Sequence, residues 1–336
     1  MSAKGLNTKD IHYQVKVDNA HAHLWCVTLH LLKPSAKQQF QLPVWIPGSY
    51  LVREFSKQLS DMQATQVGQP LKIEQLDKCT WQTNCKANQP LQLQYKIFAH
   101  DHSVRTSWLD ANRGFFNGTS MFVQALGKTH SSLCLELLAP AHTDNWKVAT
   151  ALKAQRIDAA GFGTYHAQNY DELVDSPVEL SAFLSSEFSV RKSKHEIVVT
   201  GAAPSFDAHQ LQQDVEKICQ TTIHFWHRSS PPAFKNYVFL LNAVADGYGG
   251  LEHQNSTALL CRRKDLPKVS DKSRTDDYIG LLGLFSHEYF HAWNVKRMRP
   301  EIMKTTTTKA SNIPTCFGFL KALQTTTTTC CCVALN

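Results

Sequence analysis

The chain has 336 residues, of which 43% are hydrophobic and 19% are charged, a balance typical of soluble globular proteins. Its formal net charge is +7, but the basic residues are dispersed and not interleaved with aromatic residues, which argues against nucleic-acid binding. No apolar run approaches the roughly 18 residues of a membrane-spanning helix, and the N-terminus lacks the apolar segment of a signal peptide, so we expect a cytoplasmic protein that binds no membrane. The length favours two domains, and the scattered cysteines are expected to be reduced.

Residues 10–190 are predicted to form a β-rich domain. Residues 11–17 alternate apolar and polar side chains as a half-buried strand does, and residues 24–32 and 91–97 repeat the pattern. Short strands separated by turn residues favour a sandwich or a large antiparallel sheet. Residues 42–50 place two prolines and a glycine among large apolar residues, which predicts a fixed loop packed on this domain.

The pattern changes near residue 200. Residues 208–226 carry apolar side chains at helical spacing, and Pro231 and Pro232 end that helix. Residues 237–244 form a continuous apolar run, which indicates a strand buried on both faces. A glycine-containing turn over 246–250 is expected to lead into a strand over 251–260 that is polar at its start.

The last predicted helix carries an H-E-x-x-H motif. Asp276 or Asp277 is expected to cap this helix, which must end before Pro300. On a helix, positions i and i+4 share a face, so His287 and His291 can bind one cation while Glu288 takes a proton from water. The alternative is a pair of core histidines beside an exposed glutamate.

The segment Gly249-Gly250-Leu251-Glu252-His253 precedes that helix and suits substrate binding. Paired glycines let a peptide approach the backbone closely, and the Glu252 carboxylate can pair with a free α-amino group. The alternative is a glycine turn that leads into an edge strand with a solvated glutamate.

The order G-G-L-E-H followed by H-E-x-x-H-x-W-N resembles the glycyl aminopeptidase family of zinc metallopeptidases. Residues 44–55, 117–120 and 172–179 resemble the N-terminal β domain of that family. The resemblance implies a zinc ion on His287 and His291, Glu288 as general base, and Glu252 near the substrate N-terminus. It also implies removal of small N-terminal residues, such as Gly or Ala, from a peptide substrate.

The resemblance implies an α+β chain. Residues 1–190 would form the antiparallel β domain, and residues 191–304 an incomplete thermolysin-like α/β catalytic domain. Residues 305–336 are rich in Thr and Cys and are expected to be a disordered, aberrant tail, and the C-terminal PDZ module of the family is absent from this sequence.

The third zinc ligand of the family is a glutamate beyond the second histidine, but this chain has no Asp or Glu after Glu301. Glu301 itself and the Cys330-Cys331-Cys332 triplet are poorer candidates, because neither has the usual ligand spacing. With two imidazoles alone, zinc should bind weakly and catalysis should be impaired.

The tail suggests a change of reading frame near Lys304. In the neighbouring frame the junction of Leu320 and Lys321 can encode Glu, and the junctions within the Thr run at 325–329 can encode Tyr and Asp. The shifted peptide can therefore contain the missing ligand segment, which the coding DNA would reveal.

Two other functions are compatible with the sequence. One is a non-catalytic β-domain protein that binds peptides or partners and keeps the metal helix as a remnant. The other is a thermolysin-like endopeptidase, which, unlike an aminopeptidase, would cleave substrates with a blocked N-terminus. The natural substrate and the oligomeric state are left open.

Overall fold

The computed structural model describes residues 10–46, 52–141, 143 and 145–298. The predicted tail, Glu301 and part of the predicted 42–50 loop therefore lie outside the described residues. The described residues form two compact units. The first runs up to Leu180, and the second starts at Ser181 and also includes residues 149–151. In the described ranges no helix is long and apolar enough to span a bilayer.

The boundary between the units precedes the predicted position at residue 190. β17 (Leu184–Val190) pairs along its whole length with β18 (Ser193–Thr200), so it belongs to the second unit. A two-residue connection at Arg191 and Lys192 joins the two strands, and both of these residues have positive φ angles of 49° and 67°. The polar composition of β17 hid this pairing in the sequence.

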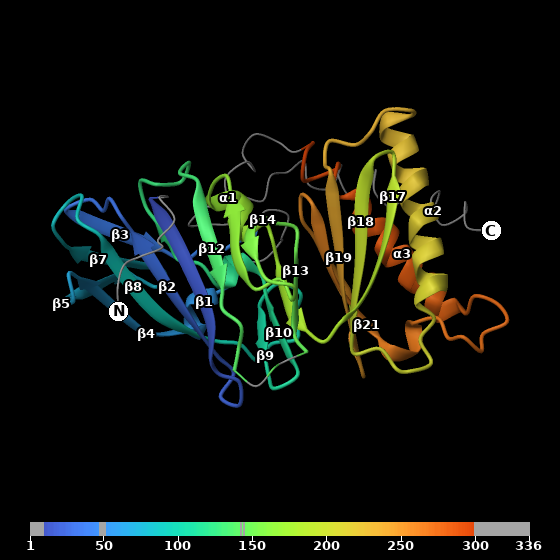
Figure 1. The fold of residues 1–336 in the computed structure, drawn as a ribbon, viewed down its shortest axis with the longest axis horizontal. Helices are drawn as coiled ribbons and strands as arrows, with labels where there is room; N and C mark the ends of the chain where they lie inside the picture. The colour runs from blue at the N-terminus through green and yellow to red at the C-terminus, as the bar shows by residue number, and fades with distance from the viewer. Residues whose placement is uncertain (1–9, 47–51, 142, 144, 299–336) are drawn as a thin grey trace. The chain divides into compact units, whose positions relative to one another are not determined.

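The predicted antiparallel β domain is confirmed, although β1 and β12 pair in parallel. Its largest sheet has the strand order β14-β15-β12-β1-β2-β8-β4-β5, and β1 pairs with β12 in parallel (Figure 1). The strands of this sheet are β1 (Ile11–Asn19), β2 (Leu24–Leu31), β4 (Leu59–Gln66), β5 (Gln69–Leu71), β8 (Leu91–Phe98), β12 (Leu133–Leu137), β14 (Lys153–Ile157) and β15 (Gly163–Ala167).

Two four-stranded sheets complete the β-rich part, in the orders β11-β3-β7-β6 and β13-β16-β10-β9. Residues Leu42, Trp45 and Ile46 are fully buried, which agrees with a packed loop in the described part of 42–50. The remaining elements are β3 (Lys37–Gln41), β6 (Ile73–Asp77), β7 (Thr80–Asn84), β9 (Ser107–Leu109), β10 (Arg113–Phe116), β11 (Gln124–Ala125), β13 (Lys147–Thr150), β16 (Val178–Ser181), α1 (Tyr170–Val174), and the short 3-10 helices η1 (Phe55–Gln58) and η2 (Gly118–Ser120).

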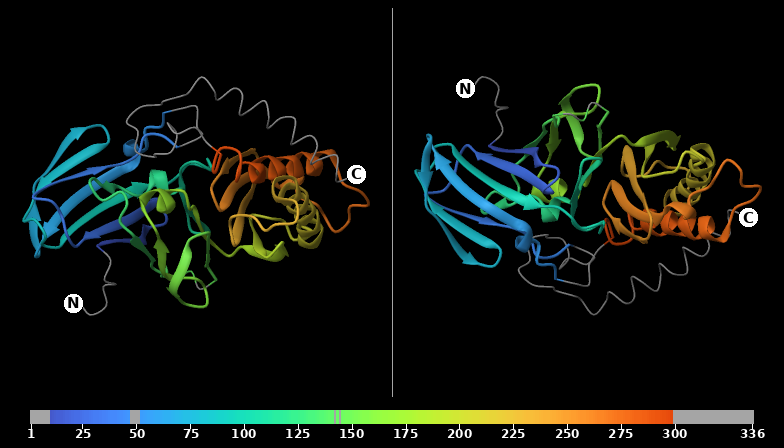
Figure 2. Two further views of the ribbon diagram at one scale, coloured as in Figure 1. Left: turned by 90° about the horizontal axis from the view of Figure 1, so that it is seen from above. Right: turned by 90° about the horizontal axis from the view of Figure 1, so that it is seen from below.

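The second unit is a five-stranded sheet covered by two helices. The strand order is β17-β18-β19-β21-β20, with β19 (Asn236–Val244) and β21 (Ser256–Arg262) parallel to β18 and β20 (Gly249–Glu252) antiparallel at the edge. The helices α2 (Ala208–His227) and α3 (Asp276–Phe290) pack together against this sheet (Figures 1 and 2). The short 3-10 helix η3 (Arg263–Asp265) follows β21.

Three local predictions for this unit are wrong. The single strand expected over 251–260 is a hairpin, because the chain turns after Glu252, and the backbone N–H of His253 donates to the Ser256 carbonyl at 2.9 Å. The paired glycines lie in β20 and not in the preceding turn. Helix α3 is capped by Thr275, whose side chain accepts from the Tyr278 N–H at 3.2 Å.

A buried ion pair fixes the start of α3 against α2. Asp214 of α2 is fully buried, and Arg274 donates to its carboxylate at 2.6 and 3.0 Å. The Tyr278 hydroxyl donates to the same carboxylate at 3.0 Å. Although burial alone raises the pKa of Asp214, the Arg274 and Gln210 hydrogen bonds outweigh it and hold that pKa below its usual value. The charged Asp214 therefore orients the helix that carries the H-E-x-x-H motif.

Candidate metal centre

The H-E-x-x-H residues lie at the C-terminal end of α3. His287 and Glu288 are in its last turn, and His291 caps the helix with helical backbone angles of φ −64° and ψ −18°. The helical geometry thus continues through the motif, and the two imidazole rings lie 5.0 Å apart between centroids with their planes at 90°. The structure brings both histidines to one face of the helix end.

The turn after α3 sets the tautomer of His291. Its Nδ1 lies 2.9 Å from the backbone oxygen of Asn294. Because a carbonyl only accepts, Nδ1 carries the proton and Nε2 keeps its lone pair for a metal ion. Such an outer hydrogen bond is usual for metal-binding histidines.

A second hydrogen bond joins the last turn of α3 to β18. The side chain of Tyr289 donates to Nε2 of the fully buried His195 at 2.8 Å, and Nδ1 of His195 donates to the Ser193 carbonyl at 3.0 Å. Burial lowers the pKa of His195 to about 4, so this ring is neutral at physiological pH. The bond links β18 to the helix residue next to Glu288.

Donor atoms of Glu252, Glu288 and His291 all lie within 4.8 Å of one another. No other group of three His, Cys, Asp or Glu side chains in the described residues meets that spacing. His287 is half-buried and stands beside this group without being part of it. Nitrogen and oxygen donors of this kind suit zinc, so the residues present fit such an ion.

Strand β20 lies directly against the carboxylate of Glu288. A Cβ atom added at Gly250 would overlap with the Glu288 side chain, whereas one added at Gly249 would meet nothing within 4 Å. Alternate residues of a strand share a face, so Gly250 and Glu252 both face α3. Of the two glycines, only Gly250 is required by this packing.

Glu252 is only 9% exposed, and burial alone would raise its pKa. When no metal ion is bound and His291 is protonated, its charge and that of Lys296 outweigh burial and lower the pKa of Glu252, which favours the ionised carboxylate. Two other residues of the predicted G-G-L-E-H segment pack inside the protein. Leu251 is buried, and His253 is buried in the hairpin turn.

Arg297 is a site residue that the sequence did not single out. Its guanidinium donates to the carbonyls of Gln254 and Ala292 at 2.8 and 2.6 Å, and to the Asn255 side chain at 2.8 Å. It therefore ties the β20–β21 turn to the residue that follows His291. In the sequence Arg297 is one of many dispersed basic residues, and nothing distinguished it.

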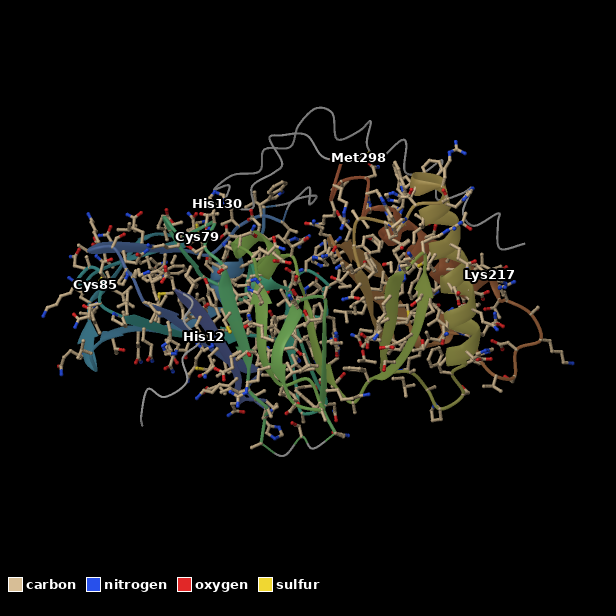
Figure 3. All side chains as sticks on the ribbon, turned by 45° about the horizontal axis from the view of Figure 1, so that its top comes forward. His12, Cys79, Cys85, His130, Lys217 and Met298 are labelled. Carbon is tan, nitrogen blue, oxygen red and sulfur yellow. The ribbon has the colours of Figure 1, made fainter. Side chains whose placement is uncertain are left out.

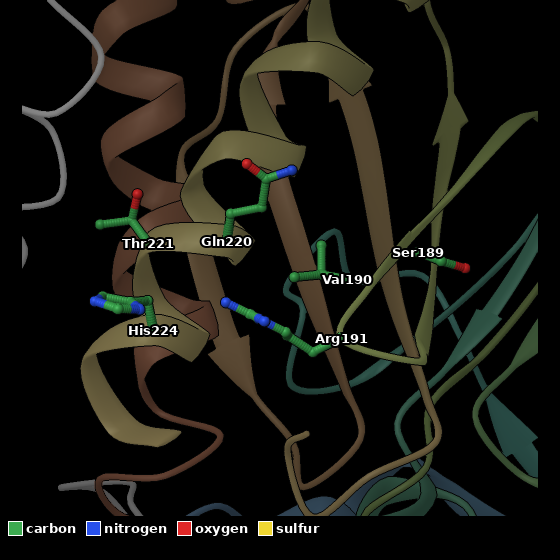
Figure 4. A pocket seen from close by; sticks show the side chains of 6 residues that line it. All are labelled: Ser189, Val190, Arg191, Gln220, Thr221 and His224. Carbon is green, nitrogen blue, oxygen red and sulfur yellow. The ribbon is translucent and has the colours of Figure 1, made fainter. Parts of the chain in front are cut away.

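A pocket between the end of β17 and α2 is separate from this centre (Figure 4). Arg191 extends from the β17–β18 connection toward the α2 side chains Gln220 and His224. None of the predicted site residues lines this pocket.

Two family models match the chain. The Peptidase M61 N-terminal domain matches residues 12–182, and the M61 glycyl aminopeptidase model matches residues 280–316. The second match includes the H-E-x-x-H motif and extends past Lys304. No curated protein matches the chain.

Solved structures also resemble this fold. An aminopeptidase N family protein from Idiomarina loihiensis is 37% identical over 88% of this chain, with a TM-score of 0.83. This chain covers 51% of that protein, so it spans about half of its length. Aminopeptidase A of Legionella pneumophila, solved with aspartic acid, is 11% identical over 85% of this chain and 34% of its own, with a TM-score of 0.54, and shares the fold alone.

Proposed function

Because this chain belongs to the M61 glycyl aminopeptidase family, we propose that it is a zinc-dependent aminopeptidase whose chemistry takes place between β20 and the end of α3. The observation that carries the proposal is the buried group of Glu252, Glu288 and His291, whose donor atoms lie within 4.8 Å of one another. A helix end and an edge strand thus offer a base, a metal ligand and an amine-binding carboxylate at one point.

His287 and His291 would hold the zinc ion, which when bound supplies a more acidic water and a polarised peptide carbonyl. Glu288 is the general base: its carboxylate takes the proton of the attacking water and returns it to the leaving amine. Its packing against Gly250 fixes the direction of that carboxylate.

The substrate is proposed to bind as an extended peptide along β20. Among the described residues this strand is the last of its sheet, so we propose that its outer backbone edge pairs with a peptide. The ionised Glu252 would then neutralise the free α-amino group, which selects peptides with an unblocked N-terminus. A preference for N-terminal Gly is proposed from the family description, and Ala is proposed with it from the family resemblance of the sequence.

We also propose that residues 1–336 by themselves bind zinc weakly and turn over substrate slowly. Residues 302–336 contain no Asp or Glu that could act as the third ligand inferred from the family resemblance. Structural and catalytic zinc sites use three or four protein ligands, so two imidazoles alone should release the ion readily.

The test combines metal content with turnover on the purified full chain. Zinc is measured by native mass spectrometry across a zinc titration, and hydrolysis of Gly- and Ala-amides is measured at each point. We expect weak zinc-dependent hydrolysis, loss of the ion in His287→Ala, and no cleavage of acetylated substrates. Cleavage of blocked peptides at the same rate would favour the endopeptidase, and peptide binding without zinc would favour the non-catalytic binding protein.

A further inference from the structure

The outer polar face of the eight-stranded sheet carries a second group of metal-binding side chains. On β1, His12 lies opposite His30 of β2 and beside Cys134 of β12. Two residues further along β1, Gln14 lies beside Glu136. Alternate side chains of a strand share a face, so these residues lie on the side opposite Tyr13 and the hydrophobic core. Figure 3 marks His12 on β1, in the first unit.

His12 is unusual because its ring is buried without hydrogen bonds. The residue is 8% exposed, and neither Nδ1 nor Nε2 has a hydrogen-bond partner among the described residues. Buried polar atoms nearly always have a hydrogen-bond partner. A buried ring without one therefore suggests that its nitrogen atoms bind a ligand, such as a metal ion, that is not part of the polypeptide. A carboxylate is already close: Glu136 Oε2 lies 3.3 Å from His12 Nε2.

Glu136 and His30 complete the arrangement. Gln14 donates to Glu136 Oε2 at 2.8 Å, which holds the carboxylate beside His12. The His30 ring stacks on His12 with centroids 5.7 Å apart and an interplanar angle of 29°. Burial lowers the pKa of both histidines although Glu136 opposes the shift, so both rings are neutral at physiological pH, the form that binds metal ions.

We propose that His12, His30 and Glu136 form a second divalent-metal site, suited to zinc, with the reduced thiol of Cys134 as fourth donor. Zinc bonds of about 2.0–2.1 Å at tetrahedral angles separate two ligand atoms by roughly 3.3 Å. The His12 Nε2 to Glu136 Oε2 distance equals that separation.

The ion would assemble this site by turning one side chain. Among the described residues only the α3 group already has three donors within 4.8 Å, so His30 must rotate to direct a ring nitrogen at the ion. His30 is half-buried, so part of its side chain borders solvent. His166, the next residue in the row beyond Cys134, is a poorer ligand because its Nδ1 bonds the Leu133 carbonyl at 3.3 Å.

Such an ion would join the β1–β2 pair to β12, a strand from a distant part of the chain. β1 and β2 are neighbours in sequence, but Gln14 and Glu136 are 122 residues apart. Because binding requires all three strands in register, the ion would stabilise the folded first unit and not the unfolded chain. The proposed role is therefore structural and is independent of the peptidase site.

The test uses Co²⁺ and Zn²⁺ with the full chain carrying His287→Ala and His291→Ala, which removes the α3 ligands. We expect one bound equivalent, a sulfur-to-cobalt charge-transfer band if Cys134 joins, and a higher melting temperature with Zn²⁺. His30→Gln should abolish all three, whereas the matched variant His166→Gln in the same row should keep them.

A second measurement guards against misfolding of the double variant. In the otherwise unchanged chain, His30→Gln should bind one equivalent fewer than the parent at the same free metal concentration, with an equal melting temperature in EDTA. The proposal is overturned if the double variant binds no ion, or if binding survives both His30→Gln and Glu136→Gln.

Discussion

Two histidine pairs in this chain are placed in different ways. His287 and His291 are one helical turn apart, and their rings meet because α3 continues to its cap. His12 and His30 face each other across two antiparallel strands, and their acidic neighbour comes from a third strand. The helical pair depends on local geometry, whereas the sheet pair depends on register between segments far apart.

This difference sets how ready each pair is to bind an ion. At α3, His291 already stands in a group whose donor atoms lie within 4.8 Å, and its tautomer is fixed by Asn294. On the sheet, the two rings are stacked and one must turn. We therefore expect the helical centre to carry chemistry and the sheet centre to carry stability.

The largest expected effect is on kcat, and it should distinguish Glu288, beside the helical histidine pair, from Glu136, beside the sheet pair. Glu288→Gln removes the proposed general base and should lower kcat about 10²–10⁴-fold while bound zinc is retained. Glu136→Gln should leave kcat unchanged, because Glu136 lies in the other centre. Steady-state kinetics at saturating zinc, together with zinc content, measure both. Equal losses in the two variants would show that the centres are not independent.

A substitution at the glycine pair tests the contact between β20 and the helix. Gly250→Ala should push the Glu288 carboxylate aside and lower kcat/KM about 10²-fold, since small displacements of catalytic groups are costly. Gly249→Ala is the matched control, because its added methyl group meets open space. If both variants behave alike, the packing of Gly250 on Glu288 has no catalytic role.

The orientation of α3 is tested from its far end. Asp214→Asn breaks a buried ion pair whose Arg274 partner is partly exposed, and should destabilise the second unit by about 2–3 kcal/mol. Because hydrogen bonds to Arg274 lower the folded-state pKa of Asp214, its stabilisation is complete well above the unfolded-state pKa and is lost as the pH falls through the folded-state pKa. Urea titrations between pH 3 and 7 should show a smaller decline for the variant than for the parent. A variant as stable as the parent at pH 7 would contradict this.

The smallest effect is expected at the turn after His291. Arg297→Ala removes three hydrogen bonds that join the β20–β21 turn to the end of α3, and should raise KM by about tenfold, or roughly 1.4 kcal/mol, with zinc retained. Arg297→Lys should recover part of the loss. A fall in kcat at constant KM would instead place Arg297 in the chemical step.

Local patterns in the sequence were sufficient to predict the main helices and strands of each unit. The apolar spacing over 208–226 gave α2, the continuous run at 237–244 gave β19, and the alternation at 11–17 gave β1. The hairpin at 249–262 was missed because its turn lies inside a polar stretch that also suits a strand. The α3 cap was assigned to Asp276 or Asp277, but these residues lie in the first turn after Thr275.

Some site residues can likewise be placed from neighbouring residues in the sequence, whereas others depend on contacts between distant segments. The i and i+4 spacing places His287 and His291 from sequence alone, whereas the position of Glu252 beside them needs β20 at the sheet edge. Arg297 and the His12 group depend on contacts between separate segments, and no local pattern marked them. The third zinc ligand and the frameshift hypothesis concern residues beyond 298 and stay predictions.

The parallel pairing of β1 with β12 has a consequence for synthesis of the protein. β1 leaves the ribosome before β12 and can form a hairpin with β2, but its pairing with β12 must wait until the chain has grown by about 120 residues. Long-range parallel pairing is slow, and unpaired edges invite aggregation. The nascent chain should therefore depend on chaperones until β12 docks.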